Sequence, residues 1–145
     1  MHKEFKALRL RQLDRTLAAF TAARQTERPQ HGWLRAIRQS LGLSMEDVAK
    51  RLAGIKPLIQ QFEDAERDDR ITLGSLRRVA DALGCTLVYA IVPKTGTLTE
   101  LAERRIRDQV ARDVHAVERT MALEDQAVGD VEQLVKEETK RRQKQ

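Results

Sequence analysis

The chain has 145 residues, enough for one compact domain with extensions, and combines 41% hydrophobic with 34% charged residues. The formal net charge of +5 favours a polyanionic partner, and an aromatic content of 3% argues against a surface that stacks single-stranded nucleic acid. Residues 1–32 hold seven lysines and arginines against three acidic residues, so most of the positive surplus lies near the N-terminus. A single cysteine, Cys85, excludes an internal disulfide and a cysteine-based zinc site.

Composition also indicates the fold class and the cellular compartment. Helix-forming residues dominate, and prolines occur only at positions 29, 57 and 93, which predicts a mainly helical protein. No apolar stretch approaches the roughly 20 residues that span a bilayer, and the N-terminus lacks the apolar block of a secretory signal. We therefore expect a cytoplasmic protein that does not enter the membrane.

Residues 1–31 are predicted to form an N-terminal amphipathic helix followed by a linker. The pattern begins at residue 4 and ends near Pro29, and basic residues lie between the apolar positions. These apolar positions are Phe5, Leu8, Leu13, Leu17 and Phe20.

Residues 32–84 show four short helical patterns, over 33–41, 45–52, 56–67 and 73–83. Ser44 is the expected N-cap of the second helix, with Asp47 as its capping-box partner. Thr72 is the expected N-cap of the fourth, and Gly84 is expected to end it in a left-handed conformation.

Residues 85–93 break the helical period, because they form one β-branched, apolar run between Gly84 and Pro93. A lone strand cannot satisfy its own backbone groups, and no second segment of this kind occurs in the sequence. We therefore predict a C-terminal β-strand that pairs with a second copy across a two-fold axis, which makes the protein a homodimer. The pairing residues are predicted to be Leu87, Val88, Tyr89, Ala90, Ile91 and Val92.

Residues 94–145 are predicted to form a helical tail. An apolar stripe at helical spacing runs through Leu98, Leu101, Val110, Val114, Val117 and Met121, and apolar residues continue it from 128 to 135.

The most informative segment is residues 43–63, where two predicted helices are joined by a tight turn at 53–55. The small side chain of Ala49 allows the two helices to cross closely. This arrangement holds the second helix at the surface, where its N-terminal residues can enter a DNA major groove.

The segment resembles the XRE family of phage repressor and Cro-like helix-turn-helix proteins over Trp33–Leu83, in register without a gap from Arg38 to Glu63. It is more similar still to a small branch of bacterial regulators called mobile mystery protein A, above all in Ala82–Pro93. The resemblance implies a lambda repressor-like domain that represses transcription of its own operon. Since genes of this branch commonly neighbour a gene for a Fic-domain protein, it also implies an antitoxin-like role with a Fic-domain partner.

By their positions in the family, several residues are implied to contact double-stranded DNA. Lys56 could donate to guanine and Gln61 could bind adenine through two hydrogen bonds. The predicted set is Lys56, Pro57, Gln60 and Gln61 on the second helix, together with Ser44 and Arg70. Three positions depart from the family pattern: Ile55 cannot cap the second helix, Met45 stands where many relatives carry Gln, and Pro57 lies within the first turn of the second helix, where a missing N–H is tolerated.

In the register of the phage repressors that the segment resembles, Arg38 faces Glu63, which implies a partly buried structural ion pair between the helices over 33–41 and 56–67, in preference to a phosphate contact by Arg38. The basic residues of the N-terminal helix, such as Arg9, Arg11 and Arg15, have two interpretations that the sequence leaves open. They contact the DNA backbone, or they form an ordinary solvated face.

Enzyme functions find little support. The histidines His2, His31 and His115 are scattered, and Cys85 has no histidine at a suitable spacing, so we expect no catalytic site, no metal and no cofactor. Thr120 and Glu124 match part of a motif with which helices silence Fic enzymes, but Asp125 stands where that motif has Gly or Asn. The sequence thus predicts a sequence-specific, homodimeric repressor, and the alternative is an antitoxin-like interaction module whose DNA binding is secondary.

Overall fold

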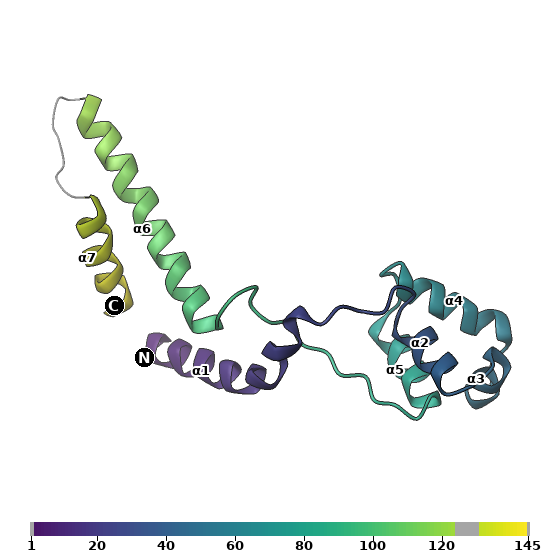
Figure 1. The fold of residues 1–145 in the computed structure, drawn as a ribbon. Helices are drawn as coiled ribbons and strands as arrows, with labels where there is room; N and C mark the ends of the chain where they lie inside the picture. Colours follow the sequence, from purple (N-terminus) through teal and green to yellow (C-terminus); the bar gives the residue numbers. More distant parts are fainter. Residues whose placement is uncertain (1, 124–130, 145) are drawn as a thin grey trace. The chain divides into compact units, whose positions relative to one another are not determined.

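The structure is a computed structural model that describes residues 2–123 and 131–144, and it divides the chain into two compact units. The central unit is formed by Gln25–Tyr89, and the terminal unit combines Met1–Arg24 with Ala90–Gln145. The described residues are mainly helical, as predicted (Figure 1). The sequence analysis had assigned the N-terminal helix and the C-terminal tail to separate segments, whereas both belong to the terminal unit.

The central unit packs four short helices around one hydrophobic core. They are α2 (Trp33–Ser40), α3 (Met45–Arg51), α4 (Lys56–Arg67) and α5 (Leu73–Ala82). All four contribute side chains to the core, which excludes water from their facing sides. The buried core residues are Leu34, Val48, Ala49, Ile59, Val79, Ala82 and Leu83.

Local capping sets the ends of these helices, as the sequence predicts. Ser44 and Asp47 form a capping box at the start of α3, in which each side chain accepts a hydrogen bond from the other's backbone N–H. The Thr72 hydroxyl accepts a hydrogen bond from the Ser75 backbone N–H at the start of α5. Gly84, at φ 74°, follows α5 in the left-handed conformation that its sequence position predicts.

The terminal unit contains α1 (His2–Thr21), α6 (Leu98–Leu123) and α7 (Val131–Lys144), with a 3-10 turn at Ala22–Gln25 after α1. Asp14 on α1 accepts hydrogen bonds from the backbone N–H groups of Leu98 and Thr99 at the start of α6. The Thr99 hydroxyl also donates to this carboxylate, and these bonds hold the pKa of Asp14 below its ordinary value. Asp14 therefore joins α1 to α6 as an ionised cap.

The predicted C-terminal strand is absent from the structure. Among residues 2–123 and 131–144 no strand is present, and Cys85–Val92 has no regular secondary structure. The structure therefore does not support the predicted strand. A strand is defined by the neighbour to which its backbone groups bond, and this structure holds one chain, which offers the segment no such neighbour.

In the described part of the chain, no helix is long and apolar enough to cross a membrane.

Candidate nucleic-acid interface

Helices α3 and α4 are joined by the short turn that separates Arg51 from Lys56. Ala53 adopts the left-handed conformation at φ 49°, and the Gly54 N–H bonds to the Ala49 carbonyl oxygen at 2.9 Å. This bond reverses the chain directly after α3, in the manner of a Schellman motif. The buried methyl group of Ala49 leaves room for the second helix, so the four residues 52–55 are enough to connect α3 to α4.

Helix α4 presents two faces of opposite character. Ile59, Glu63 and Glu66 are buried, at the spacing of four and three residues that defines one helix face. In its first two turns Pro57, Gln60 and Gln61 lie away from that face and are exposed, and Lys56 is exposed at the start of the helix. The structure therefore brings together the four residues of α4 that were predicted to contact DNA, all with their side chains in solvent.

The start of α4 lacks a side-chain cap. Ile55 is the N-cap residue and makes no capping hydrogen bond, as the sequence predicts. Pro57 lies in the first turn, where its missing N–H removes no hydrogen bond within the helix. The next residue, Leu58, donates its backbone N–H to the Ile55 carbonyl oxygen at 3.0 Å, which closes the first turn of α4.

The predicted ion pair between Arg38 and Glu63 is present and joins α2 to α4. The Arg38 guanidinium donates from Nε to Glu63 Oε1 at 2.5 Å and from Nη2 to Oε2 at 3.1 Å. The side chains are only 9% and 5% exposed. The bond to Glu63 raises the pKa of Arg38 against the opposing effect of burial, so the guanidinium stays charged. Arg38 Nη1 also donates to the Leu43 carbonyl oxygen, which fixes the loop before α3.

Glu66 makes a second connection between α4 and α2 that the sequence analysis missed. Its buried carboxylate accepts hydrogen bonds from the backbone N–H groups of Trp33 and Leu34, at 2.7 and 2.8 Å. It thereby caps α2 from another helix. Gly32, at φ 92°, makes this approach possible, because a Cβ atom there would lie 2.7 Å from Glu66 Oε2.

Two features of the sequence could have revealed this connection. Gly32 has no side chain with which to cap α2, so the first N–H groups of that helix need an acceptor from elsewhere. Glu66 lies seven residues after Ile59 and three after Glu63, which places it on the buried face of α4.

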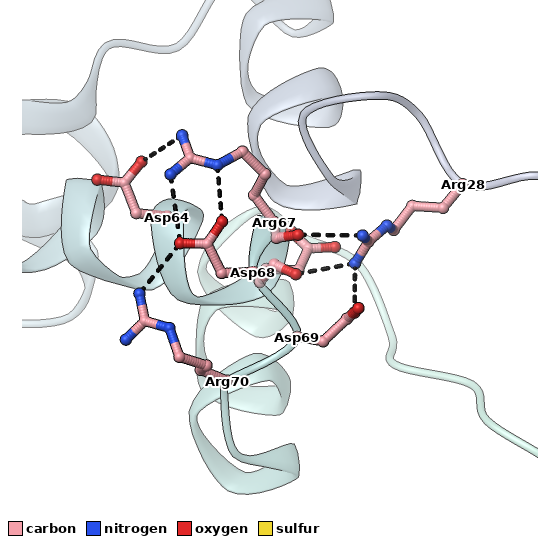
Figure 2. A network of polar contacts seen from close by, with 7 residues as sticks. Arg28, Asp64, Arg67, Asp68, Asp69 and Arg70 are labelled. Atoms are coloured by element: carbon pink, nitrogen blue, oxygen red, sulfur yellow. Dashed lines mark hydrogen bonds and ion pairs between the residues drawn. The ribbon is translucent and has the colours of Figure 1, made fainter.

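Arg28 anchors the segment before α2 to the end of α4 (Figure 2). Its guanidinium donates to the carbonyl oxygens of Glu66 and Arg67 and pairs with Asp69 at 2.8 Å. Carbonyl oxygens at a helix C-terminus have no partner within the helix, and a cation is favoured there. The sequence analysis also missed this contact, since it joins residues about 40 positions apart and follows no local motif.

Arg70 and Ser44, the other predicted DNA contacts, are engaged within the protein. Arg70 follows the C-terminus of α4, a helix about 18 Å long by its rise per residue, and Lys56 lies at the opposite end. The Arg70 guanidinium pairs with Asp68, which also binds Arg67 (Figure 2). Hydrogen bonds from Arg67 and Arg70 hold the pKa of Asp68 below its ordinary value. The Ser44 hydroxyl donates to Asp47 at 2.7 Å. The structure therefore does not join Arg70 to the exposed face of α4.

Other groups that could support catalysis or metal binding are dispersed. Within residues 2–123 and 131–144, no group of three or more His, Cys, Asp or Glu residues could hold a metal ion. His115 lies 3.6 Å from Glu118 on the surface of α6, and Cys85 is half-buried beside the central core. Glu124, the residue of the predicted Fic-silencing motif, lies outside the described residues, as does Asp125.

Comparison with protein families, with curated proteins and with solved structures gives no match for this chain.

The ion pair between Arg38 and Glu63 leads to a prediction about stability. Replacing either residue with Met leaves the other charge buried without its partner, which should lower the free energy of unfolding by about 3–5 kcal/mol. Arg38→Met should be the more harmful, because it also removes the bond to Leu43. The double variant should recover part of the loss, and chemical denaturation of all four proteins gives the coupling energy.

The exposed pair of Asp64 and Arg67 provides a matched control, since its side chains are 42% and 41% exposed. The same double-mutant cycle there should give a coupling energy below about 1 kcal/mol. Strictly additive effects at Arg38 and Glu63 would contradict the structural role of that pair.

Proposed function

We propose that this protein is a sequence-specific DNA-binding transcriptional regulator, with α3 and α4 forming a helix-turn-helix in a lambda repressor-like domain. Helix α4 is the recognition helix and enters the major groove with its N-terminal turns. Lys56 and Gln61 read base edges, Gln60 assists them, and Pro57 lies against the DNA without a donor of its own. The regulator acts as a repressor of its own operon.

One observation carries this proposal. The first two turns of α4 hold a face of exposed residues with hydrogen-bonding capacity, while two buried carboxylates on the other face fix the helix to α2. Base reading requires polar side chains on an element that does not move, since each bidentate contact depends on the position and angle of both groups. The exposed glutamines and the lysine match the donors and acceptors that the major groove offers.

We further propose that the protein binds DNA as a homodimer through the Leu87–Val92 segment. Val88, Tyr89 and Ile91 are 65%, 59% and 87% exposed. A segment of six residues without secondary structure thus places three large apolar side chains in solvent. Antiparallel pairing with the same segment of a second copy covers these side chains and satisfies the backbone groups. The recognition helices of the two copies then contact two half-sites of the DNA operator that are about 34 Å, or one helical turn, apart.

The DNA contacts of α4 lead to a prediction about affinity. Replacing Lys56 or Gln61 with Ala should weaken binding to the operator by about 1–3 kcal/mol each and leave the thermal unfolding temperature unchanged. Fluorescence anisotropy with a duplex from the DNA upstream of the coding sequence measures the affinity, and a scrambled duplex measures non-specific binding. Gln61→Ala removes no charge, so it should lower the affinity for the upstream duplex and leave the affinity for the scrambled duplex unchanged.

Lys136→Ala supplies the control, because it removes an exposed lysine from α7. It should leave the affinity for the upstream duplex unchanged. A Lys56→Ala, Gln61→Ala double variant that binds this duplex as tightly as the unmodified protein would refute the assignment of α4 as the recognition helix.

The proposed dimer leads to a prediction about self-association. Ile91→Asp places a charge in the apolar interface and should raise the dimer dissociation constant at least about tenfold, equivalent to about 1.4 kcal/mol. Thr86→Asp, at the exposed polar position directly before this segment, should have a much smaller effect. Sedimentation equilibrium at micromolar concentration measures both, and an unmodified protein that sediments as a monomer there would exclude this dimer.

A further inference from the structure

The positive charge of this protein lies outside the unit that carries α4. Residues 25–89 contain ten lysines and arginines against nine acidic residues, so the central unit is almost neutral. DNA-binding proteins draw much of their affinity from cations that neutralise phosphates and release counterions. The central unit has a surplus of only one positive charge, so we expect most phosphate contacts to come from the terminal unit.

Helix α1 holds the largest local surplus. His2–Thr21 contains five lysines and arginines against two acidic residues, whereas Leu98–Leu123 of α6 contains five of each. One of the two acids on α1, Asp14, is hydrogen-bonded to the N-terminus of α6. Glu4 is the other acid on α1.

Arg11 and Arg15 are four residues apart on one side of α1, and we call this pair the α1 basic face, whereas Lys6 and Arg9 are neighbours on a different side of the helix. All four side chains are exposed, and none of them forms an ion pair with a described residue. Arg9 lies over the Phe5 ring, 5.7 Å from its centroid, which leaves the guanidinium positively charged. By contrast, Arg141 and Arg142 on α7 pair with acids of the same unit.

The α1 basic face does not stabilise the helix on which it lies. Arg11 and Arg15 are four residues apart, so their like charges are neighbours on the helix surface and repel each other. An external polyanion would relieve this repulsion. Arginine is well suited to such a ligand, because its planar guanidinium can bind two phosphate oxygens at once.

We propose that the α1 basic face binds the phosphate backbone of double-stranded DNA, as a second contact surface apart from the recognition helix. This inference rests on the proposed DNA-binding function, and it assigns the sequence-independent part of the affinity to α1. The phosphate contacts supply attraction to any duplex, and the exposed face of α4 selects among sequences.

A membrane surface is the other polyanion that a basic amphipathic helix can bind. Helices that lie in a membrane interface separate a continuous apolar face from a charged one. On α1 the exposed apolar residues Phe5 and Leu8 are interleaved with the cations, and Arg9 lies over one side of the Phe5 ring. This mixed surface favours a hydrated phosphate backbone over an acyl layer.

The test compares the full-length protein with an Arg11→Gln, Arg15→Gln variant on the upstream duplex and on a scrambled duplex over a range of salt concentrations. Removing two phosphate contacts should lower the slope of log K against log salt by about 1.8 in magnitude on both duplexes. Affinity near 0.1 M salt should fall by about tenfold or more, while the ratio of affinities for the two duplexes stays constant.

The matched control is Arg105→Gln, Arg107→Gln on α6, which removes the same charge from exposed residues that form no ion pair in the described part of the chain. It should leave the slope unchanged, and thermal unfolding should confirm that both variants are folded. An unmodified protein that binds neither duplex refutes the proposed function. If the unmodified protein binds DNA and the α1 variant keeps its full salt slope, the α1 proposal alone is refuted. The α1 variant is also tested on vesicles of equal phosphatidylglycerol and phosphatidylcholine. If it loses binding to these vesicles while its salt slope on DNA stays unchanged, the α1 proposal is overturned in favour of a membrane surface.

Discussion

Two buried carboxylates one turn apart on α4 hold this helix against α2. Glu63 binds the Arg38 side chain, and Glu66 binds the backbone N–H groups at the start of α2. Because the two contacts reach opposite ends of a helix of eight residues, α4 can neither slide along α2 nor rotate about its own axis without breaking one of them. Buried charges cost several kcal/mol to desolvate, so this arrangement is maintained only while every partner is in place. Its effect is to fix which side chains of α4 face solvent.

Helix ends in both units are completed by side chains that come from elsewhere in the chain. Asp14 of α1 caps the start of α6, and Arg28 binds the last carbonyl oxygens of α4. Arg51 of α3 donates to the carbonyl oxygen of Ala82 at the end of α5. Each contact pairs a charged group with the end of a helix dipole of opposite sign. Short helices gain little from their own hydrogen bonds, so these caps and the apolar core hold them in place.

The sequence was sufficient for features that depend on neighbouring residues. The bounds of α4 are those that its periodicity predicted, and the caps at Ser44 and Thr72 follow from local side chains. The ion pair of Arg38 and Glu63 was also anticipated, but from the resemblance to phage repressors, in whose register these residues face each other, and not from the residues alone. The roles of Arg28 and Asp14 could not be read in this way, since each joins distant parts of the chain, whereas the missing cap at Gly32 and the helical spacing of Glu66 were signals in the sequence. The strand predicted at 87–92 is not supported by the structure, and its pairing was predicted to depend on a second molecule.

The central claim is that the exposed N-terminal turns of α4 lie against DNA, and mapping the contact on the protein tests it most directly. The isotopically labelled protein is titrated with the duplex from upstream of its coding sequence while its backbone amide resonances are followed. The account predicts that the largest shifts occur at Lys56 and at Leu58–Gln61, with the buried face of α5 near Ala80 unchanged. Shifts confined to other helices, with the amides of α4 unmoved at saturation, would contradict it.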